Sequence, residues 1–178
     1  MSGAMMSEEV SSPQQVVIRR AEATDAQAVY ELVVALVEAR DAMDKMVSSV
    51  EDIVRDGFAA DPAFEALIAE VGGKAVGLCL YFGSYSTWRG QRGLYVQDLV
   101  VAENARSLGV GRRLLAATAA LAKARGGGYL RLSAEADNAH AQAFYQRGGF
   151  RHSEAELIYV LDDADFDDLA GGAAETET

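Results

Sequence analysis

A glycine-bearing turn in the middle of the chain has the residue types that bind an anion. The apolar stretch Leu94–Val101 runs into a turn that contains Arg106 and Gly109, and a run with helical periodicity follows. Backbone N–H groups and the partial positive charge at a helix N-terminus bind phosphate groups. Because glycine has no Cβ, Gly109 and Gly111 allow phosphates to approach the backbone closely. The spacing Arg-x-x-Gly-x-Gly therefore predicts a pyrophosphate site, to which Arg112 adds positive charge.

For this short motif taken alone, a glycine-rich turn without a ligand is the alternative. Two other nucleotide sites do not match the sequence. The chain has no Gly-Lys-Ser/Thr triplet, which a phosphate-binding P-loop requires. Its glycine spacing also does not suit a dinucleotide-binding fold.

A second group of residues with possible chemistry lies about thirty residues later. Asn138 is a good helix N-cap, and Phe144 and Tyr145 stand at the end of a short helical stretch before Gly148 and Gly149. A tyrosine hydroxyl can protonate a leaving thiolate, because the pKa values of phenols and thiols differ by only about two units. An aromatic pair packed under the end of a helix is the alternative interpretation.

Hydrophobic periodicity and turn residues predict the elements that position these groups. The predicted strands are Val16–Arg20, Phe64–Val71, Ala75–Phe82, Leu94–Val101, Tyr129–Ala134 and Phe150–Val160. The predicted helices are one that begins at a capping box of Thr24 and Gln27, followed by Val50–Phe58, Gly109–Arg125 and Asn138–Arg147. A polar connection is expected over Gly83–Gly93. This order predicts a single α/β domain with a mixed, mostly antiparallel sheet of about six to seven strands, flanked by about four helices.

Charge and composition define the expected limits of the domain. The net charge is −11, yet none of the 16 basic residues lies after Arg151, where the acidic residues continue to the end. We therefore predict a disordered segment over 1–14, a domain over 15–162 and an acidic tail over 163–178. The acidic balance argues against a nucleic-acid partner, which needs a basic surface. No apolar run approaches the ~18 residues of a membrane span, and no secretory signal is visible, so a cytoplasmic protein is expected.

The single cysteine and the two histidines give little sign of chemistry. Cys79 stands in the apolar run VGLCLYF and is predicted to be a small buried side chain. His140 and His152 have no cysteine or histidine at ligand spacing, so no metal is expected.

Taken together, the two motifs resemble those of the GNAT acetyltransferases. Arg106-x-x-Gly109-x-Gly111 is similar to the acetyl-CoA pyrophosphate loop of that superfamily, and Asn138 to Tyr145 with Gly149-Phe150 is similar to its second cofactor motif. The resemblance implies that acetyl-CoA is the co-substrate and that Tyr145 protonates the leaving CoA thiolate. The implied cofactor-binding residues are Leu99, Val100, Val101, Arg106, Ser107, Leu108, Gly109, Val110, Gly111, Arg112, Asn138, Ala141 and Tyr145.

A finer resemblance is to the spermidine/spermine acetyltransferase branch, which acetylates small diamines and lysine-like amino acids. It rests on Tyr81-Phe-x-Ser-Tyr85-x-Thr-Trp88-x-Gly90 followed by Gly93-Leu-Tyr-Val-Gln-Asp98. The resemblance implies a homodimer that acetylates a small-molecule primary amine. The implied acceptor-binding residues are Glu38, Arg40, Tyr85, Trp88 and Gln97.

The sequence departs from this branch at two points. Gln97 stands where the family has a glutamate that meets the amine, and Ala39-Arg40 stands where polyamine-acetylating members have Tyr-Glu. A neutral amide cannot accept the amine proton, so this proton is expected to leave through water, with Glu135 or Asp98 as the candidate base. Arg40 is either a solvated surface charge or a contact for a carboxylate on the acceptor. The alternatives to a small-molecule acetyltransferase are a non-catalytic acyl-CoA-binding module, and an enzyme acting on a protein N-terminus or an antibiotic amine.

Overall fold

The computed structural model describes residues 15–174, which form two compact units, one ending at Glu135 and one beginning at Ala136. The first unit is built on a five-stranded sheet in the order β1-β2-β3-β4-β5. Its strands are β1 (Val16–Arg20), β2 (Glu65–Val71), β3 (Lys74–Ser86), β4 (Gln91–Val101) and β5 (Gly127–Leu132). The first four strands pair antiparallel, and β4 pairs with β5 in parallel. The predicted mixed α/β fold is confirmed, with five strands among the described residues.

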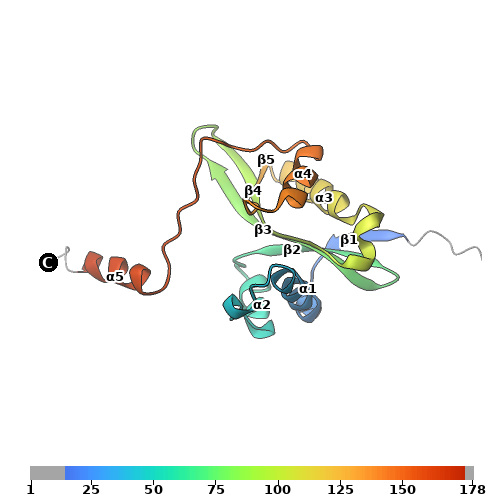
Figure 1. Cartoon of the computed structure of the whole chain (residues 1–178), viewed down its shortest axis with the longest axis horizontal. Helices are drawn as coiled ribbons and strands as arrows, with labels where there is room; N and C mark the ends of the chain where they lie inside the picture. Colours follow the sequence, from blue (N-terminus) through green and yellow to red (C-terminus); the bar gives the residue numbers. More distant parts are fainter. Residues whose placement is uncertain (1–14, 175–178) are drawn as a thin grey trace, which may run out of the picture. The chain divides into compact units, whose positions relative to one another are not determined.

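Helices cover both faces of this sheet (Figure 1). On one face lie α1 (Ala26–Glu38) and α2 (Val50–Gly57), and on the other lies α3 (Val110–Ala124). Strand side chains alternate between the faces, since successive residues point in opposite directions. Leu78 therefore packs in the cluster under α1, whereas Cys79 beside it accepts a hydrogen bond from Thr118 of α3 at 3.2 Å. Cys79 is fully buried, as predicted, and burial raises the pKa of its thiol to about 11.

The core between the sheet and the first two helices is built from small and medium apolar side chains. Each of its members is less than a tenth exposed, so the cluster excludes water. Its members are Ala26, Val29, Leu32, Ile53, Ala66, Ile68, Leu78 and Val100. Since Val100 belongs to β4, this core anchors the strand that carries the candidate site.

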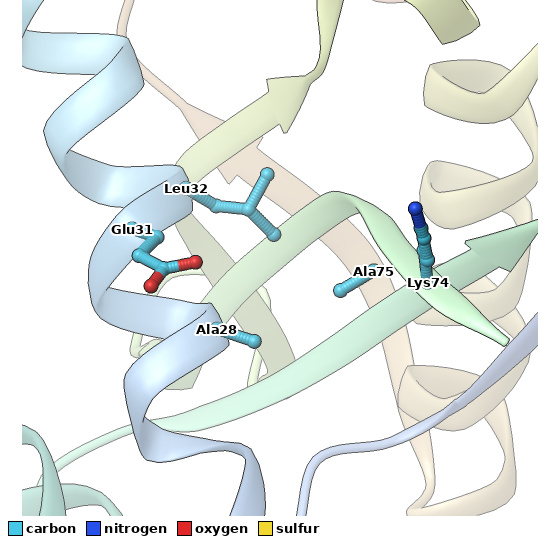
Figure 2. A pocket seen from close by; sticks show the side chains of 5 residues that line it. All are labelled: Ala28, Glu31, Leu32, Lys74 and Ala75. Atoms are coloured by element: carbon cyan, nitrogen blue, oxygen red, sulfur yellow. The ribbon is translucent and has the colours of Figure 1, made fainter.

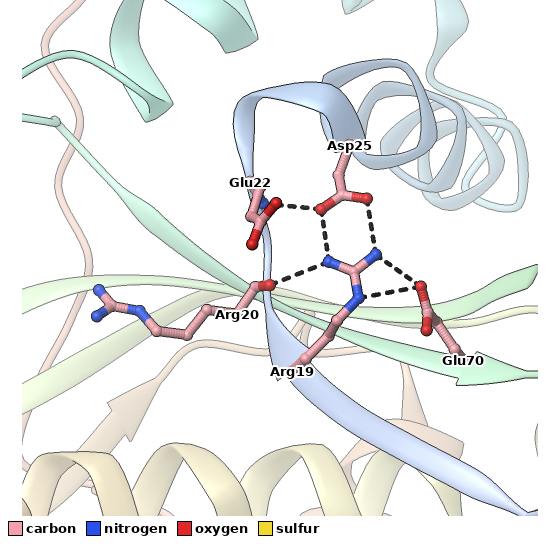
Figure 3. Close-up of polar contacts among 5 residues, drawn as sticks. All are labelled: Arg19, Arg20, Glu22, Asp25 and Glu70. Carbon is pink, nitrogen blue, oxygen red and sulfur yellow. Dashed lines mark hydrogen bonds and ion pairs between the residues drawn. The ribbon is translucent and has the colours of Figure 1, made fainter. Parts of the chain in front are cut away.

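A polar network ties the start of α1 to the sheet (Figure 3). The Arg19 guanidinium on β1 donates two hydrogen bonds to Asp25, at 2.6 and 2.8 Å, and two to Glu70 on β2. Asp25 also accepts a hydrogen bond from the backbone N–H of Glu22 at 2.7 Å. These contacts hold the pKa of the Asp25 carboxyl below its ordinary value, with the Arg19 hydrogen bonds as the main cause.

The entry into α1 differs from the prediction. A 3₁₀ turn, Ala23–Asp25, precedes the helix, and Asp25 rather than Thr24 makes the capping contact. The Gln27 amide instead donates to Glu31 one turn along α1. Thr24 loses the role because the Arg19 network already fixes Asp25 beside the open backbone N–H of Glu22.

The second hairpin is longer than the sequence pattern suggested. The residues 83–93, predicted as a polar connection, continue both strands as far as the pairs Tyr85–Arg92 and Ser86–Gln91. Only the turn 87–90 lies outside the ladder, and Gly90 has a φ of 57° there. Strand pairing overrides polarity here, because the backbone bonds form whether or not one face is apolar.

The second unit contains α4 (Ala139–Arg147) and α5 (Asp163–Ala174). The predicted strand Phe150–Val160 is wrong, because none of these residues joins a ladder among the described strands. Within the predicted acidic tail, the residues from Asp163 to Ala174 form α5, with Asp163 and Asp165 in its first turn, where carboxylates favour a helix. With α5 the described chain has five α-helices rather than four. The disorder predicted for 1–14 lies outside the described residues.

Candidate functional site

Strand β4 separates from β5 half-way along its length. Its parallel pairing with β5 extends only from Arg92 to Val96, whereas its pairing with β3 continues to Val101. Leu80 lies opposite Asp98 and Tyr81 lies opposite Val96, so Gln97 is an extra residue, a β-bulge. Bulges occur often beside active sites, where they bend a strand and end its pairing.

The separation leaves one edge of β4 without a strand partner from Gln97 to Val101 among the described residues. Peptide groups on such an edge can bond to an extended ligand. The predicted cofactor residues Leu99, Val100 and Val101 all lie on this edge. The Val100 side chain is only 5% exposed and packs in the core, so a ligand would meet this residue through its main chain.

The N-terminus of α3 follows directly and has the features of an anion site. Gly109 is its N-cap, with a φ of 69° that favours glycine. The first N–H groups of a helix have no carbonyl partner within it, and the first turn of α3 has no acidic residue. Arg112 is exposed beside them, whereas Val110 is fully buried and fixes the turn to the core. This geometry fits a pyrophosphate group.

The turn before α3 is a 3₁₀ helix, Glu103–Leu108. Ala105 is buried, and the Arg106 guanidinium reaches the carbonyl of Val101 at 3.5 Å and the Glu103 carboxylate at 3.4 Å. Arg106 thus ties the end of β4 to the turn while its side chain stays largely exposed. Leu108 is partly exposed, and the side chain of Ser107 lies outside the described structure.

Three charged residues from distant parts of the sequence meet near the bulge. Arg40, just after α1, has its Nε atom 3.4 Å from Oε1 of Glu135, just after β5. Arg40 also interacts electrostatically with Asp98 of β4. Burial raises the pKa of the Asp98 carboxyl, and the positive charge of Arg40 opposes this rise. Each of these residues was a candidate from the sequence, but nothing in their spacing indicated that they lie together.

The remaining predicted acceptor residues lie apart from this cluster. Glu38 ends α1 and is exposed, and Gln97 is exposed at the bulge. Tyr85 pairs with Arg92, five residues before Gln97, which is roughly 16 Å along the strand. Trp88 is fully exposed in the turn between β3 and β4. Within one chain, therefore, Tyr85 and Trp88 are not brought to Arg40.

The second unit holds the predicted catalytic tyrosine on α4. Asn138 caps this helix, since its Oδ1 accepts from the backbone N–H of Ala141 at 3.0 Å. The Tyr145 ring makes edge contacts with Phe144 and Phe150, at centroid distances of 5.4 and 5.7 Å. The predicted N-cap is confirmed, and the aromatic contacts fix the plane of the Tyr145 ring.

Two hollows in the first unit do not coincide with the charged cluster. One lies between α1 and the start of β3, lined by Ala28, Glu31, Leu32, Lys74 and Ala75 (Figure 2). It includes none of the predicted site residues. The other lies beside the β3–β4 hairpin and includes Tyr85, Arg92 and Arg125. Among the described residues no group of three His, Cys, Asp or Glu side chains is placed to hold a metal ion.

Comparison with known proteins decides the family. Residues 26–150 match the model of the acetyltransferase (GNAT) family, a span that includes the opened β4 edge, the Gly109 turn and Tyr145. The chain belongs to the GNAT acetyltransferase family. It is an acetyl-CoA-dependent N-acetyltransferase, as the two motifs predicted.

Curated relatives place this GNAT enzyme near the spermidine/spermine acetyltransferase branch. It is 33% identical over 150 residues to the thialysine N-epsilon-acetyltransferase of Bos taurus, covering 79% of this chain and 88% of that protein. It is 35% identical over 105 residues to the human spermidine/spermine N(1)-acetyltransferase-like protein 1, covering 55% of this chain but only 15% of that longer protein.

Solved structures agree with the fold of this GNAT enzyme. An integron cassette protein from the mobile metagenome of V. cholerae superposes with a TM-score of 0.75 at 21% identity, covering 87% of this chain and 97% of that one. An aminoglycoside acetyltransferase from an uncultured soil sample gives 0.69 at 17% identity, covering 83% and 97%. No helix within residues 15–174 combines the length and apolarity that crossing a membrane requires.

Proposed function

We propose that this enzyme transfers the acetyl group of acetyl-CoA to a small-molecule primary amine, either a diamine or a lysine-like amino acid. The observation that carries the proposal is the position of Asp98. It lies at the bulge where β4 leaves β5, with Arg40 close enough to act on its charge. The names of the relatives, which refer to thialysine and to spermidine and spermine, support the same class of acceptor.

The residues at the start of α3 suit the diphosphate of acetyl-CoA, and the opened edge of β4 suits its extended pantetheine arm. The bound co-substrate supplies a thioester carbonyl to be attacked by the amine. In this arrangement, Gly109 and Gly111 present backbone N–H groups to the phosphates while Arg112 adds charge. Leu99 to Val101 offer backbone groups to the arm, and an N–H there stabilises the developing oxyanion.

Asp98 is the residue that we assign to accept the proton from the amine, directly or through water. Gln97 has no basic group, and the Glu135 carboxylate is held by Arg40. Burial raises the pKa of Asp98 from its ordinary value, which brings a carboxylate closer to the working range of a general base. The ammonium group of an incoming acceptor is also attracted by this carboxylate before it loses its proton.

Tyr145 is the residue that we assign to protonate the leaving CoA thiolate. Its ring packs edge-on against Phe144 and Phe150, and its hydroxyl is the proton donor in this assignment. The homodimer and the cytoplasmic location remain predictions from the sequence. In a dimer, the exposed Trp88 of one subunit is available to the other.

One alternative has a specific observation in its favour. Gln97 replaces the family's glutamate at the bulge, which would suit a non-catalytic module that binds acyl-CoA without using it. Asp98 and Tyr145 argue against this alternative, since a module without a reaction has no use for a base and an acid.

An acceptor screen tests the proposal. Release of free CoA thiol from acetyl-CoA is followed with diamines, spermidine, lysine analogues, amino acids and a peptide with a free N-terminus. We expect turnover with a diamine or a lysine-like amino acid that exceeds turnover with the peptide. If acetyl-CoA raises the melting temperature but no acceptor is acetylated, the binding module is correct. Acetylation of the peptide alone would point to a protein N-terminus as the acceptor.

A further inference from the structure

We infer that Glu135 is a specificity-determining residue of the acceptor site. In the free enzyme its carboxylate pairs with Arg40, and an acceptor with its own carboxylate takes over this guanidinium. Glu135 is thus an internal competitor that weakens binding of amino-acid acceptors and leaves carboxylate-free amines unaffected. This inference rests on the proposed function, and it adds how the site distinguishes two kinds of amine.

The existing ion pair is weak enough to be exchanged. The Nε atom of Arg40 is 3.4 Å from Oε1 of Glu135, which is long for a charge-assisted hydrogen bond. Both side chains are nearly half exposed, at 42% and 46%, so water screens their attraction and solvates Glu135 when it leaves. Ion pairs of this kind contribute typically 0.2–1 kcal/mol.

A ligand carboxylate can bind the same guanidinium better. Guanidinium groups bind carboxylates most strongly through two parallel N–H···O bonds. The contact of Arg40 with Glu135 is through its Nε, at 3.4 Å, whereas charge-assisted N–H···O bonds are typically about 2.7–2.9 Å long. An acceptor carboxylate that makes two parallel bonds of this ordinary length therefore binds the guanidinium better than Glu135 does.

The arrangement also separates the two ends of an amino-acid acceptor. Asp98, which we assign to the amine, is partly buried on β4, whereas Arg40 and Glu135 are both exposed. The other charged groups beside Arg40 on its own segment are Glu38 and Asp41, both exposed. A diamine has nothing to offer Arg40 and leaves the pair with Glu135 intact.

Two acceptors that differ only by a carboxylate make the test sharp: L-lysine and its decarboxylated form, 1,5-diaminopentane. In Glu135→Gln the competitor is removed, so KM for lysine should fall roughly two- to fivefold relative to KM for diaminopentane. In Arg40→Gln, KM for lysine should rise about tenfold or more. Adding Glu135→Gln to Arg40→Gln should then have no further effect, because the two residues act as a pair.

Asp41→Asn is the matched control. It removes one exposed negative charge next to Arg40, and asparagine tolerates the positive φ of 52° at this position. A change in the KM ratio of the same size in this control would show that the effect is general electrostatics, and would overturn the pairing. If Glu135→Gln instead lowers kcat with both lysine and diaminopentane and leaves the ratio of their KM values unchanged, Glu135 acts as a base.

Failure of this inference can be told apart from failure of the proposed function. If neither lysine nor diaminopentane nor any other amine in the screen is acetylated, the proposed function is wrong. If both are acetylated and Glu135→Gln leaves the ratio of their KM values unchanged, only the role of Glu135 is wrong.

Discussion

Gly77 of β3 lies directly under Val110, the first residue of α3. A Cβ placed on Gly77 would be 2.8 Å from Cγ1 of Val110 and 3.2 Å from the backbone oxygen of Val100. The absence of a side chain at this position allows the helix terminus and β4 to approach β3 at the same time. The candidate phosphate site begins at Gly109, next to Val110. Gly77, on the strand that pairs with β4, therefore helps to set the position of that site.

Gly77→Ala should therefore lower the free energy of unfolding by about 1–3 kcal/mol, the usual cost of overpacking a core. The displaced α3 terminus should also weaken acetyl-CoA binding. Chemical denaturation and titration calorimetry measure the two effects. Gly83→Ala on the same strand is the control, because a Cβ there meets nothing within 4 Å. Equal stability of the two variants would contradict the close approach.

Gly109→Asp should abolish the stabilisation by acetyl-CoA. A ligand at 100 times its Kd raises the stability of the native state by about 2.7 kcal/mol, which is visible as a shift in Tm. The new carboxylate would repel the phosphates, although aspartate is a good N-cap and should leave α3 intact. Gly109→Asn has the same shape and tolerates the same positive φ without the charge. It should keep most of the shift. Normal binding by Gly109→Asp would mean that the phosphates bind elsewhere.

Tyr145→Phe should reduce kcat by roughly 10²–10⁴-fold with little change in acetyl-CoA affinity. The ring contacts with Phe144 and Phe150 remain in this variant, whereas the hydroxyl that would donate the proton is lost. Steady-state kinetics at saturating substrates measure the effect, and Tyr159→Phe, an exposed tyrosine of the same unit, is the control. If single-turnover rates of Tyr145→Phe match the wild type, another group protonates the thiolate.

Asp98→Asn should make the protein more stable at neutral pH and inactive. Burial raises the pKa of Asp98 in the folded state, with Arg40 opposing the rise. A carboxyl with a raised folded pKa contributes stability below its unfolded pKa of about 3.9, and this contribution is lost as the pH rises through the folded pKa. The ionised carboxylate is thus a cost at pH 7, and asparagine removes this cost.

Melting temperatures measured from pH 3 to pH 8 test this sign. The gain from Asp98→Asn should be largest at neutral pH and should shrink toward pH 3. Asp44→Asn, which changes an exposed carboxylate, is the control and should show little gain. A variant that is less stable than the wild type at pH 7 would mean that Asp98 makes favourable contacts as an anion. Full activity of Asp98→Asn would remove it as the base.

Local signals predicted the elements whose structure is decided within a few residues. The strand Val16–Arg20 has the predicted bounds, and α3 and α4 agree to within one residue, with Gly109 and Asn138 at their N-termini. A helix cap depends on the side chain and φ of one residue, and the helix that follows depends on contacts three and four residues apart. Such information lies within a short window of sequence, and the family resemblance drew on the same windows.

The tertiary structure decided what depends on pairing between distant segments. The bulge at Gln97 exists because β4 is held in register by β3, and the long hairpin exists because its polar residues still complete a ladder. The apolar run before α5 predicted a strand, yet a strand forms only where a partner offers its backbone groups. Arg40 and Glu135 are 3.4 Å apart although 95 positions separate them in the chain. Residue types and local spacing identified the chemistry, whereas the meeting of these charges beside Asp98 required the folded sheet, because only folding fixes which distant side chains are neighbours.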